Sequence, residues 1–289
     1  MSLSLTAIVL TLNEEINLAG CLQSLSWCPR LVVVDSGSSD STQQIAHQYG
    51  AEFYLHSPDG PFLITDQRNW ALSECSVDSE WVLFIDADER VSPALQKEIC
   101  SLVNSKHSFG SPLFHACYLA PAYIFCSKWL RHSQHYPNWH PRLLRPSQVQ
   151  LTGGVWESFS TLNGRPLNPE RITSISEPYT HLAFSKGIDD WLVKHLRYAD
   201  WDASLIIDYF QSKPNPSTML RKPRLRILSF RLWYLRPLLR FSHKYLFSLG
   251  FLDGWQGLLF CLLMSFYELI VVWKVISFKQ LSSCSLGNC

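Results

Sequence analysis

Two carboxylates one residue apart, Asp86 and Asp88, are the residues of this chain best suited to do chemistry. They follow a short apolar run, residues 82–85, that is typical of a buried strand, and Glu89 comes directly after them. Side chains at positions i and i+2 of an extended segment point the same way. At the carboxyl end of a parallel sheet, two such carboxylates suit a hard divalent cation that bridges to a phosphate. The spacing therefore predicts chemistry on a phosphorylated donor.

The same acids also fit a purely structural role. An acid after a strand can form an Asx turn or cap a helix. Ser92 and Pro93 carry the pattern of a helix start, with Ser92 as N-cap and Pro93 at the first helical position. The acids alone leave both interpretations open, so the elements around them must decide.

The first third of the chain alternates between strand patterns and helix patterns. Strands are expected over residues 5–12, 31–34, 53–55 and 81–85. This order argues for an α/β fold with a mostly parallel sheet that is covered by helices on both faces. In such sheets, ligands collect beyond the carboxyl ends of the strands. Asn13, Asp35 and Asp86 each follow a predicted strand, so three polar clusters are expected at one rim of the sheet.

Four short motifs occupy these strand ends and the helix between the third and fourth strands. They are Thr-Leu-Asn-Glu-Glu at 11–15, Val-Asp-Ser-Gly-Ser-Ser-Asp-Ser-Thr at 34–42, Gln-Arg-Asn-Trp-Ala-Leu at 67–72 and Ile-Asp-Ala-Asp-Glu at 85–89. In this order they resemble the family 2 glycosyltransferases, which have the GT-A fold, a Rossmann-like sheet with flanking helices. The commoner second motif has two acids, Asp-Asp-Gly-Ser. Here Ser36 replaces the second acid, so recognition of the donor base would rest more heavily on Asp35.

The resemblance implies a UDP-sugar donor site on these strand ends. Asp35 would accept a hydrogen bond from the uracil imide N–H, and Asn13 would belong to the same site. Glu14 would hold base or ribose hydroxyls, although the helix dipole explains an acid in a first turn equally well. Gly37 would allow the backbone to approach the donor closely, or would simply shape a turn.

For the diphosphate end of the donor, the resemblance implies Mg²⁺ or Mn²⁺ as cofactor. Asp88 would be the principal ligand, with Asp86 nearer the ribose and the metal. The cation would neutralise charge on the departing diphosphate. His181 would be a further metal ligand or a pyrophosphate contact, although a lone histidine is more often structural. Arg68 would meet the diphosphate or hold a nearby carboxylate; a solvated arginine on a helix face is the alternative.

The middle third carries three further motifs, at residues 139–145, 153–158 and 180–182. They resemble a bacterial subgroup of the family that includes lipopolysaccharide-core β-glucosyltransferases. That subgroup usually has His where this chain has Trp156, whereas Glu157 matches. Trp156 can stack on a sugar. Arg142 and Arg145 are candidates for an acceptor or phosphate contact, because arginine suits phosphate, with a surface ion pair as an equal alternative.

An inverting transfer needs one base. A carboxylate must take the proton of the acceptor hydroxyl as that oxygen attacks the anomeric carbon from the face opposite the diphosphate. Glu157 is the candidate for this base, and a helix-cap or surface acid is the alternative. Asp189 and Asp190 are weaker candidates.

Composition limits the classes of function. The formal net charge is +1 and charged residues make up 17% of the chain, so there is no global field that would indicate a nucleic-acid binder. The many Trp and Phe residues indicate an apolar surface. Nine cysteines without a CxxC pair or a zinc-like spacing indicate reduced thiols in a cytosolic compartment.

The C-terminal third is basic, aromatic and apolar. A linker is predicted at 213–216. The stretch from Tyr209 to Leu252, which includes this linker, holds nine Lys or Arg and no Asp or Glu. This composition fits an anionic membrane surface. Residues 258–276 are mostly apolar, with Glu268 in the middle. Because a carboxylate at the bilayer centre is costly, a helix in the membrane plane or a re-entrant pair is favoured over a span. A helix buried in the core is the alternative. Asp253 is expected to cap the helix that follows it.

Three regions follow: a nucleotide-sugar-binding half at 1–105, an acceptor-binding half at 106–185 and a helical membrane-associated region at 186–289. The expected activity is inverting, metal-assisted transfer of a hexose, with glucose favoured, from a UDP-sugar to a lipid-linked or lipopolysaccharide-type acceptor. The expected location is the inner face of the cytoplasmic membrane, with peripheral or monotopic attachment. The alternative is a membrane-peripheral protein that binds nucleotide-sugars without transferase activity. A phosphatase fits less well, because its Asp-x-Asp motif usually follows the first strand.

Overall fold

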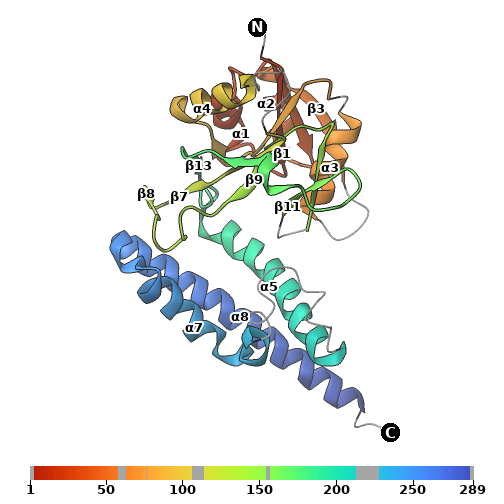
Figure 1. Cartoon of the computed structure of the whole chain (residues 1–289). Helices are drawn as coiled ribbons and strands as arrows, with labels where there is room; N and C mark the ends of the chain where they lie inside the picture. Colours follow the sequence, from red (N-terminus) through yellow and green to blue (C-terminus); the bar gives the residue numbers. More distant parts are fainter. Residues whose placement is uncertain are drawn as a thin grey trace. The chain divides into compact units, whose positions relative to one another are not determined.

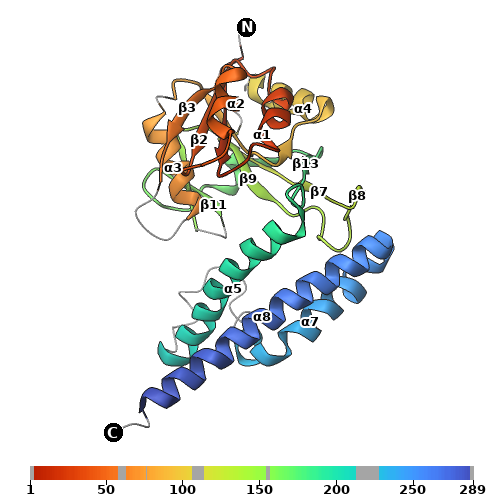
Figure 2. The same cartoon turned by 180° about the vertical axis from the view of Figure 1, so that it is seen from behind.

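The computed structural model describes residues 3–57, 63–75, 77–105, 114–153, 157–212 and 228–286 (Figures 1 and 2). Trp156 and the predicted linker at 213–216 lie outside the described residues. The chain forms two compact units. The first contains Met1–Tyr123 and Tyr136–Ser185, and the second contains Ile124–His135 and Lys186–Cys289.

The first unit is built on a seven-stranded sheet with the order β12-β6-β9-β4-β1-β2-β3. Its strands are β1 (Leu5–Thr11), β2 (Arg30–Asp35), β3 (Glu52–Leu55), β4 (Trp81–Asp86), β6 (Ala116–Leu119), β9 (His140–Leu144) and β12 (Ile172–Ser174). Strands β1 to β4 are parallel, and β9 runs antiparallel to both β4 and β6. The mostly parallel α/β sheet predicted from the sequence is therefore confirmed.

Helices cover both faces of this sheet because the central strands are apolar on both faces. All seven residues of β1 are buried. Successive residues of β4 enter different cores: Leu83 packs with residues of α1, α2 and α4, and Phe84 packs with Ala71 of α3. The bounds of these helices are Leu18–Ser24 for α1, Thr42–Gln48 for α2, Ile64–Glu74 for α3 and Pro93–Asn104 for α4.

The helix start predicted at Ser92 and Pro93 is confirmed. The Ser92 hydroxyl accepts a hydrogen bond from the Leu95 backbone N–H at 3.1 Å, and Pro93 is the first helical residue of α4. The cap thus belongs to this serine, and the acids at 86–89 are left for another role.

Short strands complete the first unit. β5 (Glu89–Arg90) pairs antiparallel with β13 (Tyr179–His181), so that His181 lies opposite Glu89. β13 also pairs with the first residues of β7 (Pro121–Phe125). β10 (Val149–Thr152) and β11 (Ser158–Thr161) form a hairpin, and the 3-10 turn η1 (Pro169–Arg171) precedes β12. These pairings bring residues from the middle of the chain to the end of β4.

The second unit is mainly helical. Its elements are β8 (Lys128–Trp129), α5 (Gly187–Ser212), η3 (Trp233–Leu235), α7 (Arg236–Ser242), the π-helical turn η4 (His243–Phe247), η5 (Gly250–Asp253) and α8 (Gly254–Leu286). The apolar segment 258–276 lies inside α8. The cap predicted at Asp253 is wrong: its buried carboxylate accepts hydrogen bonds from the backbone N–H groups of His132 and Ser133 and from the Ser133 hydroxyl. Cys21, Cys28, Cys75, Cys100, Cys117, Cys126 and Cys261 are free thiols.

Candidate active site

The carboxyl ends of β1, β2 and β4 meet at one rim, as the motif positions predict. Thr11 lies opposite Asp35, and Leu10 lies opposite Asp86, in the parallel ladders on either side of β1. The loops after β1 and β2 bind each other directly. The Asn13 carboxamide oxygen accepts a hydrogen bond from the Ser39 backbone N–H at 2.8 Å. Asn13 itself has a φ of +54°, in the left-handed region that asparagine tolerates.

Asp35 is almost completely buried, and protein donors surround its carboxylate. One oxygen accepts from the Thr11 hydroxyl at 2.8 Å and from the Ser38 hydroxyl at 2.5 Å. The other accepts from the backbone N–H groups of Gly37 at 2.9 Å and Ser38 at 2.6 Å. A carboxylate offers about four acceptor positions, so this one is fully used. A nucleotide base could bind it only by displacing one of these donors, and its role in base recognition remains a prediction.

Gly37 and Glu14 occupy the same pair of loops. Gly37 has a φ of +101° and is exposed, with open space where a Cβ atom would be. Its freedom is therefore required by the turn, and a close approach to a donor remains a prediction. The Glu14 carboxylate is buried and accepts from the Asn17 side chain at 2.7 Å, near the start of α1.

Arg68 projects from α3 and is 1% exposed. Its guanidinium donates to Glu157 at 2.5 Å and to Asp86 at 3.0 Å. Of the roles predicted for Arg68, holding a carboxylate is the one that the structure shows. The contact also brings the predicted base to the end of β4, across 89 residues of sequence. A buried guanidinium requires such partners, because an unpaired buried charge costs several kcal/mol.

Arg142 on β9 makes a second buried set of ion pairs. Its guanidinium donates to the other oxygen of Asp86 at 3.0 Å and to Glu89 at 2.6 Å. It also donates to the Tyr179 hydroxyl at 3.4 Å, which in turn bonds to His140 Nδ1 at 2.9 Å. Asp86 therefore bridges two arginines. The arrangement supports the ion-pair alternative for Arg142, with a buried pair in place of the surface pair expected.

The sequence interpretation did not include Glu89, Tyr179 and His140 in the site. Glu89 is fully buried and also accepts a hydrogen bond from the Asp86 backbone N–H at 2.9 Å. Its position three residues after Asp86 was a signal that could have been used. His140, two residues before Arg142 on the same strand, could have been found from that spacing, whereas Tyr179 carries no such signal because only the strand pairing places it beside Arg142.

The site contains more acid than base. Four carboxylates, those of Asp86, Asp88, Glu89 and Glu157, share this region with the guanidinium groups of Arg68, Arg142 and Arg90, the last of which donates to backbone carbonyls. Burial raises the pKa of Glu89 well above its usual value, and the neighbouring charges of Asp86 and Asp88 raise it further. Burial also raises the pKa of Glu157, while the Arg68 guanidinium opposes that shift. An added cation would relieve this excess of negative charge.

Asp88 and His181 form the part of the site best suited to a divalent cation. His181 Nε2 lies 3.2 Å from an Asp88 carboxylate oxygen, and the imidazole packs beside Tyr123 with ring centroids 4.6 Å apart. Among the described residues, His181 Nδ1 is buried without a hydrogen-bond partner, and no group of three or more acids, histidines or cysteines is arranged as a metal cluster. Two protein ligands suit Mg²⁺ or Mn²⁺, since Mg²⁺ usually takes one or two carboxylates and completes its shell with substrate phosphates and water. The residues present therefore fit the cation, with Asp86 committed to arginines.

Arg145 is not at this rim. It pairs with Glu80 at 3.3 Å, just before β4 begins, and its guanidinium lies 4.5 Å from the Trp81 ring centroid. Six residues of extended chain separate Glu80 from Asp86, about 20 Å at 3.3 Å per residue. The register of β9 places Arg145 beside the start of β4, three residues beyond Arg142, so a phosphate contact through Arg145 stays a prediction that its pair with Glu80 does not support.

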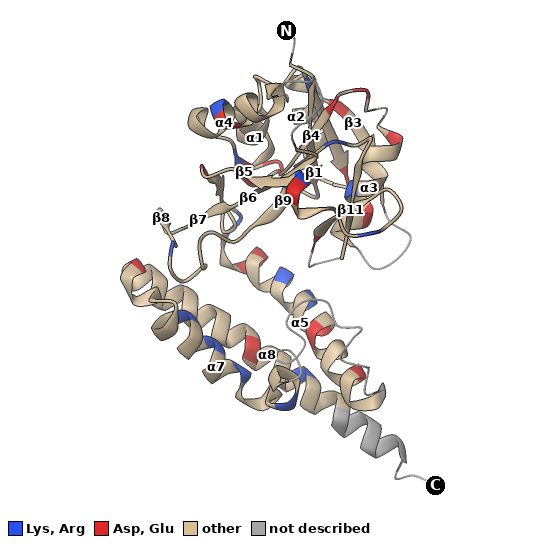
Figure 3. Cartoon of the chain, viewed as in Figure 1, with Lys and Arg blue, Asp and Glu red and all other residues tan. Residues whose placement is uncertain are grey.

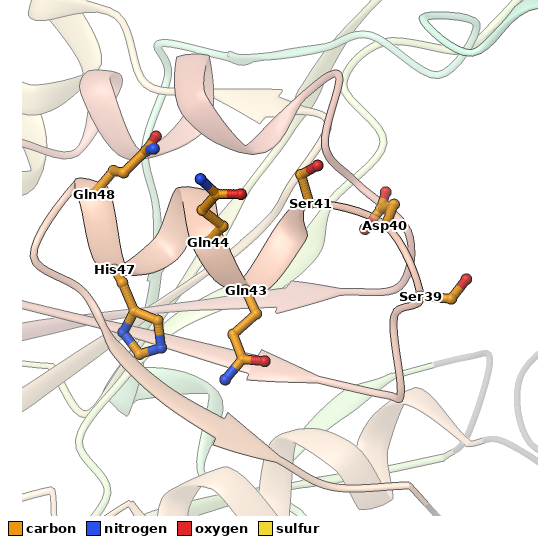
Figure 4. A pocket seen from close by; sticks show the side chains of 7 residues that line it. All are labelled: Ser39, Asp40, Ser41, Gln43, Gln44, His47 and Gln48. Carbon is orange, nitrogen blue, oxygen red and sulfur yellow. The ribbon is translucent and has the colours of Figure 1, made fainter.

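A surface hollow beside α2 is a separate feature. It is lined by Ser39, Asp40, Ser41, Gln43, Gln44, His47 and Gln48, all labelled in Figure 4. Its lining contains none of the carboxylates or arginines at the end of β4. The buried ionic groups, and not this polar hollow, mark the candidate active site.

The N-terminal part of the chain is recognised independently of this geometry. Residues 6–108 match the sequence model of glycosyl transferase family 2. This part of the chain is a family 2 glycosyltransferase domain. The family predicted from the four motifs, and with it the GT-A type of sheet, is confirmed.

Curated relatives match over the same part of the chain. The lipopolysaccharide core biosynthesis glycosyltransferase LpsC of Rhizobium meliloti (strain 1021) is 37% identical over 103 residues, which are 35% of this chain and 37% of LpsC. An uncharacterized glycosyltransferase of Rickettsia felis is 38% identical over 97 residues, covering 33% of this chain and 32% of the relative. The chain thus matches about a third of the length of these relatives.

Solved structures show more distant similarity. Glucosyl-3-phosphoglycerate synthase of Mycobacterium tuberculosis with phosphoglyceric acid is 16% identical, covers 62% of this chain and 72% of that chain, and has a TM-score of 0.43. The same synthase with Mn²⁺, UDP and glucosyl-3-phosphoglycerate has a TM-score of 0.40 at 15% identity, with the same coverage. Residues 1–349 of S. aureus TarS are 14% identical, cover 88% of this chain and 80% of that chain, and have a TM-score of 0.42.

Proposed function

We propose that the protein is an inverting glycosyltransferase that moves a hexose, with glucose favoured, from a UDP-sugar to a lipid-linked or lipopolysaccharide-type acceptor. The observation that carries this proposal is the meeting of two pairs at the end of β4. One pair, Asp88 and His181, suits a diphosphate-bound cation. The other, Arg68 and Glu157, holds a carboxylate beside it.

The donor would bind along the rim formed by the loops after β1 and β2. Asn13, Glu14 and Gly37 would contact the base and ribose, and Asp35 would hold the loop and receive the base. Asp88 and His181 would hold Mg²⁺ or Mn²⁺. When bound, such a cation stabilises the negative charge that develops on the leaving diphosphate.

Glu157 would act as the base. In the proposed step, the acceptor oxygen forms a bond to the anomeric carbon, the bond from that carbon to the diphosphate oxygen breaks, and the acceptor proton passes to Glu157. One oxygen of Glu157 is held by Arg68, and the other has no partner among the described residues. The geometry therefore leaves Oε1 available for the proton, and the positive charge of Arg68 favours the ionised form that a base requires.

Two weaker observations support the proposed acceptor and the proposed location of the enzyme. LpsC is named for lipopolysaccharide core biosynthesis, and α8 is long and apolar enough to interact with a membrane. We infer an acceptor in the cytoplasmic leaflet of the inner membrane and an enzyme that works at that surface.

The test is release of UDP, measured with UDP-glucose, Mn²⁺ and either truncated lipopolysaccharide or a lipid-linked glycan as acceptor. Glu157→Gln is expected to lower kcat by at least about a hundredfold while the donor Kd changes little, because general base catalysis contributes about 10²–10⁴-fold. Collapse of donor affinity in this variant would remove Glu157 as the base. Donor binding by the wild type without transfer to any acceptor would favour the binding-protein alternative.

A further inference from the structure

The outer surface of α7, η4, η5 and α8 is apolar along its whole described length. Between Leu238 and Phe278, the residues classed as exposed are apolar except His243 and Gly254, and the Arg240 side chain is 37% exposed. The most exposed are Phe247 at 79%, Leu238 at 69% and Trp273 at 67%. A soluble protein rarely exposes a continuous apolar surface of this length, and such surfaces usually contact a membrane or another protein. We call residues 238–278 the apolar ridge.

Several charged groups of this part of the unit are buried. Glu268, in the middle of α8, is 1% exposed and pairs with Arg236 and Arg240 of α7 at 2.7 Å each. Lys274 of α8 pairs with Asp200 of α5. The Lys244 ammonium is also buried and donates to the Ser133 carbonyl at 2.8 Å. Glu268, Arg236 and Lys244 thus lie inside while large apolar side chains lie outside, although the Arg240 and Asp200 side chains stay 37% and 68% exposed.

This arrangement bears on one expectation from the sequence. The basic residues after Tyr209 were expected to face an anionic membrane. Arg236, Arg240 and Lys244 bind partners within the unit, whereas Arg231 is exposed and the other five basic residues lie outside the described residues, so the expectation stays a prediction. The exposed side chains between Leu238 and Phe278 are almost all apolar, so insertion of that surface would not depend on attraction to acidic headgroups.

α5 differs from the apolar ridge. Its exposed residues include Asp189, Arg197, Asp200 and Asp208 among apolar ones. Figure 3 shows charged residues of both signs along α5, whereas α8 is mostly free of them. The two helices are held side by side by Lys274 with Asp200, and by the Tyr267 hydroxyl, which donates to Asp202 at 2.8 Å. The unit therefore has one apolar side and one mixed side.

We propose that the apolar ridge is inserted into one leaflet of a lipid bilayer, with α8 in the plane of the membrane and α5 toward water. Lateral insertion covers the exposed apolar side chains and leaves the α5 charges solvated. Glu268 needs no water in this position, because two arginines neutralise it.

A transmembrane course for α8 fits the structure less well. With 33 residues, α8 is about 50 Å long at 1.5 Å per residue, whereas the hydrocarbon core is about 30 Å thick. A span would draw the attached part of α5 into hydrocarbon, including Asp200, whose side chain is 68% exposed. Charges at that depth are strongly disfavoured unless they are paired inside the protein.

The first experiment measures co-flotation of the purified full chain with vesicles. We expect binding to neutral phosphatidylcholine vesicles that persists in about 0.5 M NaCl, because apolar burial is not screened by salt, whereas exposed charges are screened at a few ångströms. Binding that requires anionic lipid and disappears at high salt would overturn the proposal in favour of electrostatic attachment. A discrete lipid-free dimer that does not float would show that a second copy covers the ridge, and would also overturn it.

A matched pair of variants tests which side of the unit enters the membrane. The two variants are Leu262→Glu and Val193→Glu. Leu262 lies on the apolar ridge and is 49% exposed, and Val193 lies on α5 and is 50% exposed. Leu262→Glu is expected to reduce the vesicle partition coefficient at least about tenfold, whereas Val193→Glu should leave it within about twofold. Equal effects would refute the assignment of the inserted face. Circular dichroism of both variants controls for folding, and the wild-type salt series tests the proposal without any variant.

Orientation is tested with epitope tags at both ends of the full chain in membrane vesicles. In-plane insertion leaves both tags on the same face, so a protease removes both in inside-out vesicles and neither in intact spheroplasts. Tags on opposite faces would show that α8 spans the membrane and would refute the proposal. These outcomes do not depend on transferase activity, so they remain interpretable if the proposed function fails.

Discussion

Replacing Arg68 by Met tests whether ion pairing organises the site. Arg68 is 1% exposed and holds both Glu157 and Asp86. In the variant, Asp86 still pairs with Arg142, but Oε2 of Glu157 loses the guanidinium that donates to it. Removing one member of a buried pair costs about 3–5 kcal/mol, because a carboxylate is left buried without compensation. For a domain of this size, about 2–4 °C per kcal/mol predicts a fall in Tm of about 6–20 °C.

The matched control is Arg145→Met. Arg145 is also buried, but its only described carboxylate partner is Glu80, whose side chain is 50% exposed. A pair with one exposed partner contributes about 0–1 kcal/mol, so the variant should lose little beyond the contact of Arg145 with Trp81. Because Arg145 lies at the other end of β4, the rate of transfer should stay unchanged in this variant.

The effect of pH gives a second readout. Arg68 lowers the pKa of Glu157 against the larger effect of burial. Without Arg68, the pKa of folded Glu157 rises further above its unfolded value. The protonated acid is then favoured in the folded state, so the deficit of Arg68→Met is smallest below the unfolded pKa and grows as pH rises through the folded pKa. The acid limb of kcat should also move to higher pH.

The assays are urea unfolding at several pH values and the pH profile of UDP release. A loss of less than about 1 kcal/mol at neutral pH, no larger than that of Arg145→Met, would refute the view that the Arg68 pairs hold the site together. An unchanged acid limb with normal turnover would show that Glu157 does not act as the base beside Arg68.

Three further predictions concern other parts of the molecule. Asp88→Ala should abolish stimulation by Mn²⁺ and transfer without changing Tm by more than a few degrees; unchanged turnover would remove Asp88 as the metal ligand. Asp35→Asn should destabilise the first unit by about 1–3 kcal/mol in urea unfolding, since an amide cannot accept all four hydrogen bonds, and a variant with wild-type stability but lost donor binding would instead show a purely ligand-directed role. Burial and the nearby charges of His181 and Arg68 lower the pKa of His140 to about 4, so its imidazole should stay neutral in NMR titrations down to about pH 5; protonation near pH 6.5 would contradict the buried contact with Tyr179.

Local sequence patterns were sufficient to predict the strands and helices of the first third of the chain and the acids at the rim of the sheet. The strand at β1 is apolar and β-branched, and the start of α4 at Ser92 and Pro93 depends on neighbouring residues alone. Acids directly after a strand are positioned by that strand. Asn13, Asp35 and Asp86 therefore meet at the rim, because parallel strands place their carboxyl ends side by side.

The partners of each side chain could not be read in the same way. Arg142 and Arg145 are three residues apart on β9 and look equivalent in the sequence. The register of β9 against β4 sends one to Asp86 and the other to Glu80. A one-residue shift of that register would turn both side chains to the other face of the sheet without changing any local preference. Glu157 likewise reaches Arg68 only because the chain returns to α3 after 89 residues.

The sequence by itself determined a family 2 glycosyltransferase domain, its mostly parallel sheet and the acids at its rim, since these depend on short-range periodicity and on motifs at strand ends. Only the tertiary structure decided that Asp86 bridges two arginines, that Asp88 lies beside His181, and that Glu268 lies inside while exposed leucines and tryptophans of α8 lie outside. The reason is physical. A helix that is apolar on every side has no periodic signal to tell its inner face from its outer face, and a buried charge takes whichever partner the fold brings within reach.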